Sequence, residues 1–198
     1  KKLAFKKLSR QGAAIHRDKR PVLAIALLVH DACQQFFSGS RLSVDEHIAI
    51  KVNAFRNSII WTHVPLVMAV TECLQEAGVP AEQIVIFDYY TRELEKAGFA
   101  INEDGPGVRC YGSNGSYTGG WRLIEENTRL SNILLDCDAL INMPILKQHS
   151  MGGATIAVKN YIGFLTTAER TRRFEGDGDV MHGFFFGYST GSDYGLLG

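Results

Sequence analysis

The sequence predicts an α/β fold with a mainly parallel sheet, helices on both of its faces, a glycine-rich loop region and an irregular C-terminal segment. Two observations support this prediction. Short apolar runs typical of buried strands occupy residues 47–53, 84–87 and 139–143. Segments with the apolar spacing of a helix occupy residues 62–78 and 91–96, between these runs. Buried strands that alternate with helices are typical of a parallel sheet covered on both faces.

The first strand and the helix after it have the clearest signals. Alternation in residues 47–53 puts three large aliphatic residues on one face of the strand and Lys51 and Asn53 on the other, near its C-terminal end. Pro65 suits the first turn of the following helix, and Gly78 ends it. This segment therefore predicts a strand followed by a crossover helix.

The later part of the chain is less regular. We expect Thr91 to cap the helix that follows the second strand. Residues 102–120 contain six glycines, which predict a loop or hairpin region with a short strand at 108–111. The stretch 121–138 is ambiguous between helix and strand. Residues 154–164 predict a single helix.

Charge divides the chain into a basic start and an acidic remainder. The 198 residues hold 21 basic and 21 acidic side chains, so the net charge of zero argues against nucleic-acid binding by the molecule as a whole. Residues 1–20 nevertheless carry eight lysines or arginines and one aspartate. We expect a basic arm here, either solvated or in contact with an anionic surface. Residues 21–198 are expected to form a single α/β domain, either complete or truncated at its C-terminus.

The apolar runs and the cysteines allow a prediction of the cellular compartment of the protein. Residues 22–37 have the spacing of a core helix and lack a cleavage site typical of a signal peptide, and no segment approaches the roughly 20 apolar residues of a membrane span. We expect no transmembrane segment and a cytoplasmic location, while export of a longer precursor stays open. The absence of C-x-x-C pairs argues against a clustered metal site and predicts buried, reduced thiols. The cysteines are Cys33, Cys73, Cys110 and Cys137.

Polar residues follow the ends of the predicted strands. Lys51 and Asn53 end the first strand, Asp88 follows the second, and Lys147 and His149 follow the run at 139–143. Open α/β sheets bind ligands at the carboxyl ends of their strands. If the three strands are neighbours in the sheet, Lys51, Asp88 and Lys147 come together.

A pair of glycines after this lysine suggests an anion site. We expect Gly152 and Gly153 to open the helix at 154–164, so that backbone N–H groups and the helix dipole face a carboxylate or phosphate. Thr155 and Lys159 would then share one face of that helix. The competing interpretation is an ordinary turn with solvated side chains.

The candidate site residues fall into two groups. Acid–base chemistry or ligand orientation is assigned to three residues, and binding of a ligand or cofactor to seven others. The candidate catalytic residues are His149, Lys159 and Asp88. The candidate cofactor-binding residues are Lys51, Asn53, Lys147, Gly152, Gly153, Thr155 and Asn160. No metal site is expected, and the common nucleotide-binding and serine-hydrolase motifs are absent from the sequence.

Three blocks of sequence resemble the family of domains of unknown function numbered 362 (DUF362). They are IKVNAF, the T-x-x-P-L-V pattern within residues 62–78, and ALINMPILKQHSMGGATIAVKNYIGF at 139–164. The K-x-H followed by T-x-x-x-K-N-x-x-G is the most specific part, and the resemblance extends over about residues 45–182. The resemblance implies no particular reaction. The shared pattern comprises Lys51, Asn53, Lys147, His149, Thr155, Lys159, Asn160 and Gly163, with His182 as a weaker match. Members often carry a fused ferredoxin-like segment or a twin-arginine signal, neither of which is recognisable here.

Two hypotheses follow. In the first, the protein binds an anionic small molecule or cofactor, as a binding protein or as an enzyme that uses lysine and histidine at the strand ends. In the second, it is a redox-linked accessory or scaffold protein whose polar cluster is structural and whose basic arm recruits a partner, such as a redox partner. Neither hypothesis includes specific nucleic-acid binding. The sequence does not identify the cofactor.

Overall fold

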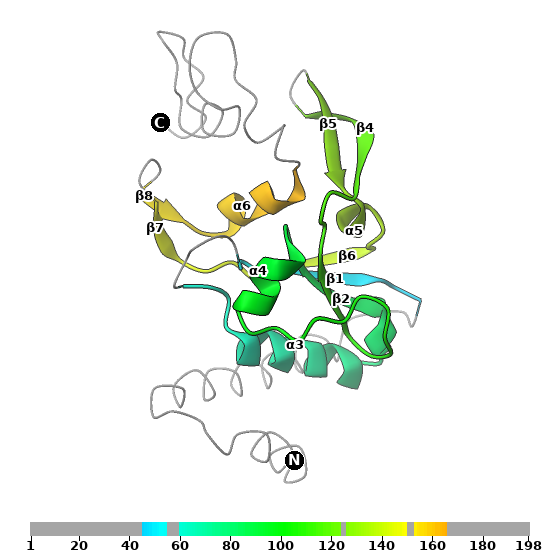
Figure 1. The fold of residues 1–198 in the computed structure, drawn as a ribbon. Coiled ribbons are helices and arrows are strands. Elements are labelled where there is room, and N and C mark those ends of the chain that lie inside the picture. Colours follow the sequence, from blue (N-terminus) through cyan, green and yellow to red (C-terminus); the bar gives the residue numbers. More distant parts are fainter. Residues whose placement is uncertain (1–44, 55–59, 124–125, 150–152, 166–198) are drawn as a thin grey trace, which may run out of the picture.

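The computed structural model describes residues 45–54, 60–123, 126–149 and 153–165 (Figure 1). The predictions for the basic arm, for the helix at 22–37 and for the irregular C-terminal segment lie outside these residues. Gly152 also lies outside them.

A four-stranded parallel sheet forms the centre of the structure, as predicted. Its strand order is β3-β2-β1-β6, and every neighbouring pair is parallel. The register places Lys51 of the central strand opposite Phe87 on one side and Asn142 on the other, so the carboxyl ends of three strands are level. The strands are β1 (Ile48–Lys51), β2 (Ile84–Asp88), β3 (Arg109–Gly112) and β6 (Ala139–Asn142).

One face of this sheet is covered by α3 (Val64–Glu76) and α4 (Thr91–Lys96). Helix α3 has a proline in its first turn and a C-terminal Gly78 at φ 104°, as the sequence predicts. Its apolar stripe packs on the alternate residues Ile48 and Ile50 of β1 and on Val52, which follows this strand. Full burial of each such side chain stabilises the fold by about 1.5–3 kcal/mol relative to exposure.

The opposite face carries shorter elements. Ile133 of α5 (Asn132–Leu135) and Phe164 of the 3-10 helix η3 (Tyr161–Phe164) form a second buried cluster with Ala49 and Phe87 of the sheet. The Phe164 and Phe87 rings stack with centroids 5.8 Å apart. Figure 1 shows α3 on one side of the sheet and α5 on the other, so helices cover both faces.

Two small antiparallel sheets accompany the main one. The ambiguous stretch after residue 121 is mostly strand, with β4 (Tyr117–Leu123) paired to β5 (Glu126–Ser131), and α5 follows directly. The second hairpin pairs β7 (Lys147–His149) with β8 (Gly153–Thr155). One further 3-10 turn, η2 (Ala81–Gln83), precedes β2.

The prediction of a single helix over 154–164 is wrong. Gly153 begins β8, α6 spans only Ala157–Asn160, and η3 follows it. Ile156, the residue before α6, has φ −141° and ψ −139°. These angles are not helical, so the helix cannot include Ile156 or continue from the residues before it. β-Branched residues at 155 and 156 favour this extended backbone. Gly153 therefore opens a strand, and Thr155 and Lys159 do not share a helix face.

The start of α4 also differs from the prediction. Tyr90 is the N-cap residue, and Thr91 is the first residue within the helix. The Thr91 hydroxyl accepts hydrogen bonds from the Gly112 backbone N–H (2.9 Å) and from Asn114 Nδ2 (2.6 Å). It therefore ties the end of β3 to α4 instead of capping the helix.

Replacement of Gly112 by alanine tests this close approach. An added Cβ would overlap the backbone of Tyr90 and Thr91, which cannot move without displacing α4. We expect Gly112→Ala to lower the free energy of unfolding by at least about 2 kcal/mol in urea denaturation. Gly119→Ala is the control, because its Cβ would meet only the flexible Arg129 side chain, at 3.3 Å, and should change stability by less than about 1 kcal/mol. Equal losses in both variants would contradict this packing.

Candidate functional site

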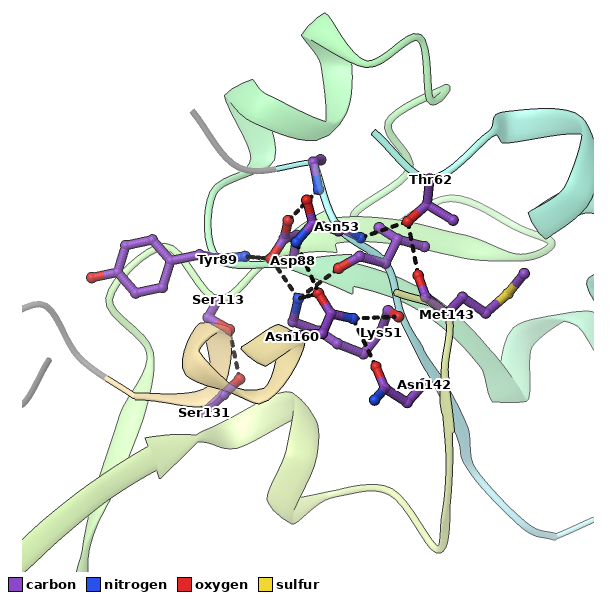
Figure 2. A network of polar contacts seen from close by, with 12 residues as sticks. Lys51, Asn53, Thr62, Asp88, Tyr89, Ser113, Ser131, Asn142, Met143 and Asn160 are labelled. Atoms are coloured by element: carbon purple, nitrogen blue, oxygen red, sulfur yellow. Dashed lines mark hydrogen bonds and ion pairs between the residues drawn. The ribbon is translucent and has the colours of Figure 1, made fainter. Parts of the chain in front are cut away.

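The candidate site lies where β2, β1 and β6 end side by side. Each of these strands is apolar and finishes in a polar residue, namely Asp88, Lys51 and Asn142. The predicted neighbour relation of the strands is confirmed by the order β2-β1-β6. Figure 2 shows the Lys51 and Asp88 side chains pointing toward each other and Asn142 pointing toward Asn160.

Lys51 and Asp88 form a buried ion pair. Lys51 Nζ lies 2.7 Å from Asp88 Oδ1, and the two side chains are 1% and 3% exposed. The ammonium also donates to the Val52 carbonyl (2.6 Å) and to Asn160 Oδ1 (3.3 Å), so its three N–H groups are matched by three acceptors. Loss of one partner would leave a buried charge uncompensated, which is strongly destabilising.

The carboxylate of Asp88 is equally well satisfied. Its Oδ1 accepts a second hydrogen bond from the Tyr89 backbone N–H (2.8 Å), and its Oδ2 accepts one from the Ala54 backbone N–H (2.6 Å). These bonds hold the chain after β1 against the chain after β2. Asp88 therefore fixes the backbone of both strand ends as well as the lysine.

Gly163 of η3 lies directly against the ion pair of Lys51 and Asp88. A Cβ built on Gly163 would lie 2.6 Å from Lys51 Cε and 3.1 Å from Asp88 Oδ1. Only a residue without a side chain allows η3 to approach this closely. The neighbouring Phe164, stacked on Phe87, holds η3 against the sheet.

Asn160, at the end of α6, joins the strand ends through its amide group. Its Oδ1 accepts from Lys51 Nζ and from Asn53 Nδ2 (3.2 Å), and its Nδ2 donates to Asn142 Oδ1 (2.7 Å) and to the Lys51 carbonyl (3.3 Å). The residue is 3% exposed. Asn142 in turn donates to the Ala157 carbonyl (3.0 Å), so α6 is bound to the sheet by both of its ends.

Lys147 brings a second ammonium to this edge. It begins β7, is half-buried, and donates from Nζ to Asn53 Oδ1 at 2.7 Å. Its pKa is lowered from the ordinary value, chiefly because burial removes water from the charged group. Asp88 acts in the opposite direction and raises the pKa, while Lys51 lowers it. Lys147 is thus a partly desolvated cation near a second cation.

The chain leaves β1 and β6 toward opposite faces of the sheet. After β1 it forms α3 on one face, and after β6 it reaches η3 on the other. Thr62 ties the two departing segments together, because its Oγ1 accepts from the Asn53 N–H (2.8 Å) and donates to the Met143 carbonyl (2.8 Å). This divergence is the topological switch point of an open α/β sheet, where ligands commonly bind.

The predicted site residues do not all meet. One hydrogen-bonded network contains five of them, Lys51, Asn53, Asp88, Lys147 and Asn160. On the second hairpin, His149 ends β7 opposite Gly153, and Thr155 ends β8 opposite Lys147. Lys159 is half-buried on α6, next to Asn160 in the sequence.

Two residues of the network were missed as site residues from the sequence. Asn142 is the last residue of β6, and Thr62 precedes α3. The signal for Asn142 was present, because it ends a buried apolar run just as Lys51 and Asp88 do. Thr62 offers no comparable signal, since a threonine before a helix is ordinary.

Within the described residues, no group of three or more His, Cys, Asp or Glu residues could hold a metal ion. Cys73 and Cys110 are buried, and burial raises the pKa of Cys110 to about 12. The Cys110 thiol therefore stays protonated at neutral pH. In the same part of the chain, no helix has both the length and the hydrophobicity of a membrane span.

The fold and the network together define an open parallel α/β protein with a polar cluster at its switch point. A family model described as a domain of unknown function (DUF362) matches residues 48–185, so the chain belongs to this family. The match includes every residue of the network from Lys51 to Gly163. Searches of the curated proteins and of the solved structures found no significant match.

The lowered pKa of Lys147 predicts a pH dependence of stability. Between the lowered pKa and the ordinary value of 10.5, the unfolded chain binds more protons at this residue than the folded chain does. The free energy of unfolding of the wild type, relative to Lys147→Met, should therefore rise as the pH increases from neutrality toward 10.5. Urea denaturation of both proteins across this range measures the difference. A difference that is flat or falls with pH would contradict the desolvation of Lys147.

Proposed function

We propose that this protein binds an anionic small molecule or cofactor at the carboxyl ends of β1 and β6, and that Lys147 contacts the anion. One observation carries the proposal. The ammonium of Lys147 lies at the switch point of the sheet, half-buried and 2.7 Å from Asn53 Oδ1. This is the position at which open α/β sheets bind their ligands.

The balance of charge in the network supports an anion. Lys51 and Lys147 carry two positive charges against the single negative charge of Asp88, and Asp88 is paired with Lys51 at 2.7 Å. Burial has already removed part of the water around Lys147, as its lowered pKa indicates. A carboxylate or phosphate beside Lys147 would stabilise the ammonium in place of that water.

The inner residues support this site without contacting the ligand. Lys51, Asp88 and Asn160 are almost fully buried, and the hydrogen bonds of their side chains are directed to one another and to the backbone. If the ligand is a substrate, His149 is the residue we propose for proton transfer, because a neutral imidazole accepts a proton near neutral pH. It ends β7, two residues beyond Lys147.

A role as a redox-linked accessory or scaffold protein is the second candidate, and one observation favours it. Among the described residues, four large apolar side chains are exposed between the residue before β7 and η3, which suits contact with a partner protein. They are Leu146 (67% exposed), Ile156 (55%), Val158 (57%) and Tyr161 (41%). In that case the polar network is structural only.

Anion binding distinguishes the two candidates. We expect isothermal titration calorimetry at neutral pH to detect binding of at least one of inorganic phosphate, ADP and citrate. Lys147→Met should weaken that binding by about tenfold or more, because a charge-assisted hydrogen bond is lost. Lys96→Met is the matched control, since Lys96 lies on the exposed surface of α4 and should leave the affinity unchanged. Equal affinities in all three proteins would contradict the proposal and favour the scaffold role.

A further inference from the structure

The amides of Asn53 and Asn160 connect the two lysine ammoniums of the network. We infer that these two asparagines form an oriented amide relay that positions the Lys147 ammonium for its anion. The relay runs from Lys51 through Asn160 and Asn53 to Lys147. This inference rests on the proposed function and assigns Asn53 and Asn160 as positioning residues, acting through Lys147.

The direction of the relay is set at its inner end. An ammonium can only donate, so Asn160 must turn its oxygen toward Lys51. Its nitrogen then faces the Lys51 carbonyl and Asn142 Oδ1, both of which accept. Because the Lys51 ammonium is fixed by Asp88, the Asn160 amide cannot be reversed without losing several hydrogen bonds.

The outer half of the relay follows from the inner half. The group of Asn53 that faces Asn160 Oδ1 must be a donor, which is Nδ2. The Asn53 oxygen is therefore presented outward, where it accepts from Lys147 Nζ at 2.7 Å. The Asn53 backbone is held as well, through its N–H to Thr62 Oγ1. Each amide thus has a single orientation, with a lysine side chain as the hydrogen-bond donor at each end of the relay.

This arrangement has a consequence for binding. A free lysine side chain loses considerable rotamer freedom when it is immobilised on a ligand. Asn53 restricts the Lys147 ammonium before any anion arrives, and it does so with a neutral oxygen that adds no negative charge of its own. A carboxylate at the same place would hold the lysine equally well but would neutralise it.

Phosphate affinity tests the relay through a double-mutant cycle. Asn53→Ala should weaken phosphate binding about fivefold to tenfold in the wild type, but by less than twofold in the Lys147→Met background, since Asn53 acts through Lys147. Asn132→Ala removes a hydrogen-bonded amide at the first residue of α5 and serves as the matched control. Equal effects of Asn53→Ala in both backgrounds would overturn the inference and make Asn53 a direct ligand contact.

A second measurement keeps the inference testable if phosphate does not bind. Asn53→Asp should raise the pKa of Lys147. The 15N chemical shift of the Lys147 ammonium measures this pKa, and circular dichroism should show that the fold is unchanged. Asn160→Leu should broaden or shift the same signal, since the orientation of Asn53 is lost. A Lys147 signal that responds to neither change would overturn the relay. A responsive signal without binding of phosphate, ADP or citrate would instead count against the proposed function alone.

Discussion

The buried contact between Lys51 and Asp88 is the interaction on which the rest of the site depends. A buried ion pair is tolerated only when each charge has its full set of hydrogen bonds, because the cost of removing both ions from water is several kcal/mol per ion. Here the remaining bonds come from backbone groups of the strand ends and from Asn160. The pair therefore requires α6 and η3 to lie across the sheet edge, and it requires a glycine at 163, where any side chain would meet Lys51.

This requirement separates two lysines that look equivalent in the sequence. Lys51 is enclosed, so its charge organises the protein and is not available to solvent. Lys147 lies further out on a separate hairpin and donates a hydrogen bond to Asn53 of the network. The inner pair and the amides provide a rigid support, and the outer ammonium provides the charge that we propose recognises an anion. Rigid support behind a contact residue is the arrangement that keeps a binding group in place without a large loss of entropy on binding.

Much of the fold follows from local patterns. Alternation in β1 and the turn signals around α3 are encoded in adjacent residues, and the structure agrees with them. Polar residues that end apolar strands also predicted Lys51 and Asp88 as neighbours. Residues 154–164 were predicted wrongly because β8 is stabilised by pairing with β7, a contact that local spacing does not reveal. The deep burial of Lys51 was not predictable either, since it depends on Asn160 and Gly163, more than a hundred residues away.

The state of the two ammonium groups tests this account most directly. In protein labelled with 15N-lysine, the Lys51 ammonium can be recognised by its proximity to the Gly163 protons, and the Lys147 signal by its loss in Lys147→Met. The account predicts a Lys51 signal that exchanges slowly with water and does not move as phosphate is added, together with a Lys147 signal that shifts until it saturates. A Lys51 signal that exchanges as fast as those of exposed lysines, or that moves with phosphate while Lys147 stays fixed, would contradict it.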